Sequence, residues 1–119
     1  KLRTMDSLMI YLGILLFLLG QTLGWFQLNV QSFSEYWKDK ALLSTILFGT
    51  PAGLFFWYGT KFAYEYIESL WSVRFLAAAL SYLIFPILTW YFMEESMFTL
   101  KTMLSISLAL SILAVQYYL

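Results

Sequence analysis

The chain has 119 residues, of which 61% are hydrophobic and 12% are charged, and its seven Lys and Arg residues balance seven Asp and Glu residues. Soluble domains carry about a quarter charged residues, so this composition indicates an integral membrane protein. The sequence contains neither Cys nor His, which excludes disulfides, thiol nucleophiles and imidazole bases, and its zero net charge argues against nucleic acid as a partner.

Four segments without a charged residue divide the chain, at 7–34, 41–60, 75–93 and 102–119. A helix needs about 20 mostly apolar residues to cross the hydrocarbon core of a bilayer, and each segment is close to that length or longer. We therefore predict an all-α fold, an integral membrane bundle of four transmembrane helices in a single domain over residues 1–119. The predicted spans are approximately 8–28, 42–58, 70–93 and 102–119.

The first predicted span carries one large polar side chain near its middle, Gln21. An amide at that depth needs a hydrogen-bond partner, because burying an unpaired polar group is costly. Gln21 is therefore either a contact that joins two helices or a polar group that faces a transport cavity.

The second predicted span contains Pro51, which removes a backbone donor, so we expect a kink there and a helix that can continue to Tyr66. Phe56 and Trp57 belong to the aromatic run that follows. Their rings either pack among the helices and at the membrane surface, or line a pocket for a flat apolar or cationic ligand.

The third predicted span begins with Trp71 and Arg74, after a very short link that makes neighbouring helices antiparallel. Arg74 stands at the start of a long apolar run. Its guanidinium either extends outward to the headgroups or reaches into the bundle, as a contact for an anion or lipid phosphate or as a partner of Glu68. Just before this span, the four-residue spacing of Lys61 and Glu65 predicts an exposed ion pair.

Small residues recur at four-residue spacing in the fourth predicted span, where Ser105 and Ala109 form one pair and Ser107 and Ser111 another. Small side chains let two helix backbones approach closely. The spacing predicts a helix–helix contact, with a helix of the same chain or of a second copy.

The distribution of positive charge leaves the membrane orientation open. Four spans place both ends of the sequence on one side, which carries Lys1, Arg3, Lys61 and Arg74; the other side carries Lys38, Lys40 and Lys101. Orientation normally follows a clear excess of Lys and Arg on the cytoplasmic side. Two alternatives remain: the first helix sets one orientation, or the chain inserts in both.

No catalytic motif, phosphate-binding loop or metal-ligand spacing occurs in the sequence. The acidic residues stand at predicted membrane edges without a His or Cys companion. We therefore expect no enzyme activity, no metal and no cofactor.

Several segments resemble the small multidrug resistance proteins, the four-span members of the drug/metabolite transporter superfamily. Residues 70–72 and 84–95 are similar to that family's third helix and its acidic turn, residues 99–101 and 107–115 to its last helix, and residues 11–12 and 19–23 to its first. The resemblance implies a homodimer, with antiparallel copies as one arrangement, that moves a small or lipid-linked molecule across the cell (inner) membrane.

The chain departs from this family at one important position. The family has a membrane-embedded Glu three residues before the Gly that matches Gly20, and this chain has Phe17 there. The usual proton antiport is therefore not expected, and the alternative is a non-transporting accessory or structural subunit that packs on a larger partner. The residues predicted to bind substrate are Phe17, Gln21, Phe56, Trp57, Trp71 and Arg74.

Overall fold

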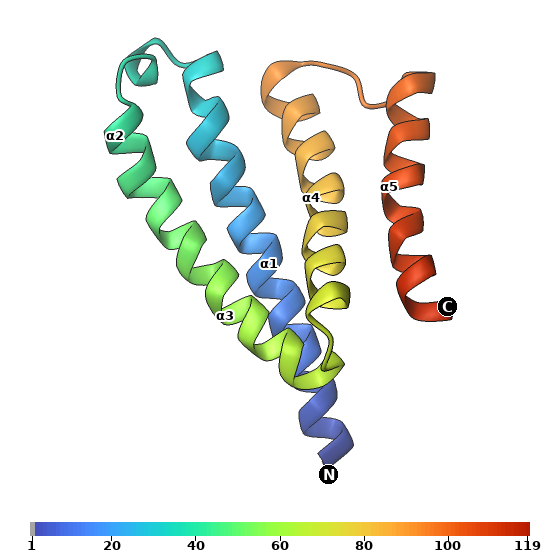
Figure 1. Cartoon of the computed structure of the whole chain (residues 1–119). Helices are drawn as coiled ribbons and strands as arrows, with labels where there is room; N and C mark the ends of the chain where they lie inside the picture. The colour runs from blue at the N-terminus through green and yellow to red at the C-terminus, as the bar shows by residue number, and fades with distance from the viewer. Residues whose placement is uncertain (1) are drawn as a thin grey trace.

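The computed structural model describes the backbone of residues 2–119 and the side chains of residues 7–119, and in this range it is all-α. Its elements are, in chain order, α1 (Leu2–Phe33), a 3-10 turn η1 (Glu35–Trp37), α2 (Ala41–Ser44), a π-helical segment η2 (Thr45–Gly49), α3 (Thr50–Ile67), α4 (Leu70–Met93) and α5 (Leu100–Tyr118). Helices α2 and α3 and the segment between them form one long, continuous rod (Figure 1).

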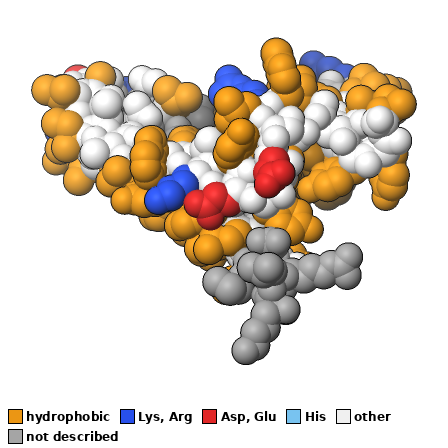
Figure 2. Space-filling view, turned by 60° about the horizontal axis from the view of Figure 1, so that its bottom comes forward, with side chains coloured by type: hydrophobic (Ala, Val, Ile, Leu, Met, Phe, Trp, Pro, Cys, Tyr) orange, Lys and Arg blue, Asp and Glu red, His pale blue; other side chains and the backbone are white. Residues whose placement is uncertain are grey.

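Four helical stretches of the described residues are long and apolar enough to cross a membrane: Ser7–Phe33, Ala41–Ile67, Leu70–Met93 and Leu100–Tyr118. Little of each stretch is buried inside the chain, and large hydrophobic side chains cover the outer flanks (Figure 2). Such extensive apolar surface matches a bilayer, and helices satisfy their own backbone groups there. The prediction of a four-span membrane protein is confirmed, and the outer faces contact lipid.

Consecutive spans run antiparallel, as the short links predict (Figure 1). Helix α1 packs most extensively against α3, α4 packs against α1, and α5 lies at the edge of the bundle against α4. Both ends of the chain and the α3–α4 connection lie at one end of the molecule, which we call the terminal end. The α1–α2 and α4–α5 connections lie at the opposite end.

Small residues bring α1 and α3 together near the terminal end. A Cβ atom placed on Gly13 would lie 3.1 Å from the backbone nitrogen of Ala63, and one placed on Gly59 would lie 2.9 Å from the ring of Phe17. Backbones approach this closely only where Cβ atoms are absent or small. The closest helix pair is therefore formed by glycines of the first two spans.

The second span changes its helical geometry just before Pro51, where the sequence predicts a kink. Residues Thr45–Gly49 form a π-helical segment, the local adjustment that accommodates a proline without an N–H donor. The hydroxyl of Ser44 donates to the carbonyl of Gln27 at 2.8 Å, which ties this irregular stretch to α1. The helix then continues to Ile67, one residue beyond the expected limit.

Defined caps end the helices at both sides of α4. Glu68 and Glu94 close α3 and α4 in left-handed backbone conformations, with φ of 61° and 57°. The hydroxyl of Ser69 accepts a hydrogen bond from the backbone N–H of Ser72 at 3.3 Å, as an N-cap does. The caps at Glu68 and Ser69 fix the tight α3–α4 turn at the terminal end, and Glu94 ends α4 at the opposite end.

The core has an apolar part near the terminal end and an aromatic part near the opposite end. The apolar part combines α1, α3 and α4 through Ile10, Phe17, Ala63, Val73, Leu76 and Leu80. In the aromatic part, Trp25 packs on Phe33 and Phe92 with ring centroids 5.9 and 5.6 Å apart. The indole N–H of Trp25 also donates to the Thr89 hydroxyl at 3.1 Å. Trp25 therefore joins α1 to α4 through this hydrogen bond and through its packing on Phe92.

Candidate functional site

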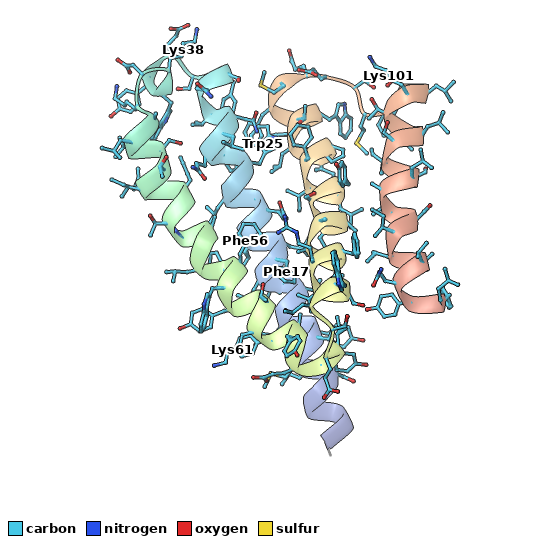
Figure 3. The ribbon with its side chains drawn as sticks, in the orientation of Figure 1. Phe17, Trp25, Lys38, Phe56, Lys61 and Lys101 are labelled. Carbon is cyan, nitrogen blue, oxygen red and sulfur yellow. The ribbon has the colours of Figure 1, made fainter. Side chains whose placement is uncertain are left out.

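A cavity of about 550 Å³ lies between α1, α3 and α4 on the terminal half of the molecule. It brings together four of the six residues that the sequence predicts as substrate contacts, Phe17, Gln21, Phe56 and Arg74. Figure 3 shows Phe17 and Phe56 between the helices of this half. The remaining lining residues are Thr60, Leu70, Val73, Ala77, Ala78 and Ser81.

Two aromatic rings form the wall on the α1–α3 side. Phe17 is only 1% exposed and faces Phe56 at a centroid distance of 6.5 Å. Gly59 makes room for the Phe17 ring, and Gly20 makes room for Phe56, because a Cβ on Gly20 would lie 3.0 Å from that ring. Phe17 therefore supports the wall and leaves only a small part of its surface to the cavity.

Gln21 joins α1 to α4 across the cavity. Its side-chain amide donates to the backbone carbonyl of Ala77 at 3.2 Å, so the hydrogen-bond partner expected from the sequence is present. Gln21 also lines the cavity, so the amide contributes both a helix–helix contact and a polar surface at mid-depth. Both sequence interpretations of this residue therefore describe part of its environment.

Arg74 lies on the exposed side of the cavity, in the second turn of α4. Among the described side chains, the ion pairs are Glu35–Lys38 and Asp39–Lys40, both at the opposite end, so no described carboxylate lies within 4.0 Å of the Arg74 guanidinium. The pairing with Glu68, one of the sequence alternatives, is not formed. Arg74 brings a positive charge to an otherwise uncharged cavity lining.

The ion pair expected between Lys61 and Glu65 is also not formed. Lys61 instead places its ammonium 5.9 Å from the ring centroid of Trp57, at cation–π distance. A lysine at a membrane surface gains from an aromatic face while its charge stays hydrated, which explains the preference for the ring.

The other two residues predicted to bind substrate lie outside the cavity. Trp57 and Trp71 are 61% and 74% exposed, and each packs against a neighbour on its own helix, Tyr58 and Phe75 respectively. Trp71 stands in the first turn of α4 at the terminal end, and Trp57 lies one helical turn before Lys61 on α3, so both rings lie toward the headgroup layer that indoles favour. Their aromatic character alone could not distinguish a belt position from a pocket position.

A second cavity of about 370 Å³ lies farther toward the opposite end, between α1 and α4. Its lining includes Gly24, Asn29 and Phe85, and it shares Gln21 and Ser81 with the first cavity. Of the residues that line it, the sequence predicted only Gln21 as a substrate contact. Residues 21, 24, 25 and 28 stand at helical three- and four-residue spacing, which was the available signal.

The small residues of α5 do not contact another helix of this chain through their hydroxyls. Ser105, Ser107 and Ser111 are exposed, and each donates at 2.8 Å to a carbonyl of its own helix, four residues earlier. Ala109 is half-buried. The predicted contact therefore remains a prediction, with a second copy or another protein as its partner.

No protein-family model, curated protein or solved structure matches this chain with significant similarity.

Proposed function

We propose that this protein is a small carrier that moves a small or lipid-linked molecule across the cell (inner) membrane as a homodimer, in the manner of the drug/metabolite transporter superfamily. The observation that supports this proposal is the 550 Å³ cavity in which three spans converge with polar and charged groups at several depths. Ligand sites in membrane bundles have this form, a mostly apolar hollow with a few placed polar groups.

The homodimer is part of the proposal because the cavity of a single chain is open on one side. Arg74 and Leu70 line it and are exposed, so one side opens to the surroundings of the bundle. A partner that covers this side would enclose the ligand and exclude lipid. The exposed, unpartnered face of α5 favours the second candidate function, an accessory subunit that packs on a larger protein.

Cysteine accessibility tests the carrier function without knowledge of the substrate, because the chain contains no Cys. Ala78 lines the cavity, whereas the adjacent Ala79 is 0% exposed and does not. We expect a water-soluble thiol reagent applied to either side alone to label Ala78→Cys in every chain of the reconstituted vesicles, since a carrier opens its site alternately to each side, whichever way the chain is inserted. Thiol reagents need the thiolate, which forms in water and not in hydrocarbon.

Two control variants define the background for this labelling. Ala79→Cys reports a buried position on the same helix, and Leu83→Cys reports a position on α4 that is 40% exposed and lines neither cavity. Both should remain unlabelled. Labelling of Ala78→Cys from either side that stops at the fraction of chains with one orientation would favour the accessory subunit and contradict a carrier.

Proton exchange at the family's usual position is not part of the proposed mechanism. Residues 7–34 contain no acidic residue and no His, and Phe17 occupies the position of the family's Glu. We therefore expect that an imposed pH gradient does not drive accumulation of a compound that the reconstituted chain transports. Glu68 stands two residues before α4, whose second turn carries Arg74, so Glu68→Gln is the matched variant. Gradient-driven uptake that survives Glu68→Gln would contradict this mechanism.

A further inference from the structure

We propose that the α1–α4 groove binds an amphiphile whose anionic phosphate headgroup contacts Arg74 and whose apolar chain lies along the two helices. The inference deepens the proposed function by naming the chemical class of the ligand, and it rests on the same cavity. It does not require that the ligand be moved across the membrane.

The two cavities form one groove along facing stripes of α1 and α4. Both are lined by Gln21 and Ser81, so they meet at the level of these side chains. On α4, Arg74, Ala78, Ser81 and Phe85 follow one another at three- and four-residue spacing and therefore lie on one face of the helix. Arg74 and Phe85 are 11 positions apart, which corresponds to about 16 Å along the helix axis, the reach of a long alkyl chain.

The chemistry of the groove changes along its length. Arg74 is the one charged residue among the side chains that line either cavity, and it stands near the terminal end. Beyond it the walls are mainly Ala, Leu, Val and aromatic side chains, interrupted by the uncharged polar side chains of Gln21 and Ser81 at the middle and of Thr60 and Asn29 elsewhere. A ligand complementary to this surface is anionic at one end and apolar along the rest.

The depth of Arg74 fits a lipid headgroup. Helix α4 begins at Leu70, so Arg74 lies about 6 Å along the axis from the start of the helix, near the boundary between headgroups and hydrocarbon. Guanidinium binds phosphate through paired, charge-assisted hydrogen bonds. A cationic ligand would be repelled at this position.

The groove is open sideways as well as at its end. Leu70, Tyr82 and Phe85 line it and are 64%, 47% and 52% exposed on the outer surface of the bundle. In a bilayer that surface faces lipid. A lipid-like ligand can therefore enter from the membrane itself, and this geometry favours a lipid phosphate over a free phosphate ion.

Quenching of tryptophan fluorescence by bromine-labelled lipid tests the proposal on the full chain in phosphatidylcholine vesicles. Trp25 lines the second cavity yet is only 4% exposed, so lipid outside the bundle does not reach it. We expect phosphatidic acid with brominated chains to quench more strongly than brominated phosphatidylcholine at equal content. The excess should disappear in Trp25→Phe.

Charge variants at the terminal end identify the headgroup contact. Arg74→Gln should weaken the excess quenching by about tenfold in apparent affinity, since a charge-assisted contact is lost. Arg74→Lys should retain most of it. Lys61→Gln is the matched control, because Lys61 lies at the same end and outside both cavities. Equal weakening by Lys61→Gln and Arg74→Gln would reduce the effect to general surface charge and overturn the proposal.

A second variant tests the chain-binding part of the groove. A Cβ on Gly24 would meet no atom within 4 Å, so Gly24→Leu fills the second cavity without a clash. It should weaken binding of the brominated lipid itself, whose chains also reach this cavity. Octyl phosphate should therefore displace the brominated lipid at a lower concentration than in the unmodified chain, whereas the concentration of hexadecyl phosphate needed should stay nearly unchanged. An equal effect on both competitors would overturn the placement of the ligand's alkyl chain in the second cavity.

Further competitors separate the sources of the phosphate and the sign of the charge. Inorganic phosphate at millimolar concentration should not displace the brominated lipid, and neither should a hexadecyl trimethylammonium cation. Full displacement by inorganic phosphate would assign the site to a free anion and overturn the lipid proposal. Arg74-dependent lipid binding, together with labelling of Ala78→Cys that stops at the chains of one orientation, would retain this ligand class and reject only the carrier function.

Discussion

Gly59→Leu is expected to destabilise the chain by about 3 kcal/mol or more, because it forces apart the closest helix pair in the bundle. The new Cβ would lie 2.9 Å from the Phe17 ring and 3.3 Å from the backbone oxygen of Gly13. The ring is enclosed and the backbone cannot retreat, so α1 and α3 must separate. Thermal unfolding in a mild detergent, followed by circular dichroism, measures the loss.

Gly53→Leu is the matched control on the same helix. A Cβ on Gly53 meets no atom within 4 Å, so the substitution should be neutral or raise stability by up to about 1 kcal/mol through helix propensity. A double variant adds a test of the mechanism. Phe17→Ala removes the ring that the introduced leucine side chain would meet, so Gly59→Leu should cost less in that background than alone. Equal costs in both backgrounds would show that the clash with Phe17 is not the cause.

The spans could be predicted from the sequence because the bilayer imposes a strong and local requirement. A helix in hydrocarbon must be apolar over its whole crossing, so the positions of 14 charged residues, seven of each sign, were enough to locate four helices. The ends were less predictable. Helix α1 continues to Phe33, beyond the predicted end at residue 28, because polar residues at a membrane surface permit a helix to extend without a stop signal, whereas α3 ends at Ile67, next to the expected limit at Tyr66.

The helix pairing could not be predicted in the same way. The fourth span has two pairs of small residues at four-residue spacing, yet the closest crossing uses Gly59 and Ala63 of α3, one such pair, against Gly13 of α1. Which small residues meet depends on the relative rotation and height of two helices, and a single sequence contains little information on either. The hydroxyls of Ser105 and Ser107 bond to their own helix.

The candidate site could be predicted only in part, through the polar side chains that lie within apolar membrane spans, where such side chains are unusual. Gln21 and Arg74 stand out because amides and charges are costly in hydrocarbon, and both line the cavity. Trp57 and Trp71 were selected as aromatic residues, and aromatic residues are common in many parts of this chain. Ala77 and Ala78 gave no signal, although their small size creates the hollow beside Arg74.

Membrane orientation is the property for which we expect the largest response to a small change in sequence. The structure places Lys61 at the terminal end and Lys38 and Lys101 at the opposite end, as the four-to-three distribution of positive charge requires (Figure 3). With so small a difference, we expect reporter fusions at the carboxyl end to detect both orientations. Three Lys residues added at that end should direct it to the cytoplasm, with a bias of about tenfold or more.

The reverse change should produce the reverse orientation. Glu95 and Ser96 are exposed in the α4–α5 connection, so Glu95→Lys with Ser96→Lys adds positive charge at the opposite end and removes only the exposed hydrogen bond from the Phe98 N–H to the Ser96 hydroxyl. This pair should direct the carboxyl end away from the cytoplasm. Glu95→Gln with Ser96→Gln removes the same hydrogen bond and should have little effect, since acidic residues contribute little to orientation.

One outcome would decide between the two alternatives for topology. A single orientation in the unmodified chain that neither Lys variant alters would show that the first helix fixes the topology. The two copies of a homodimer would then have to be parallel, because a chain with one orientation cannot supply an inverted partner.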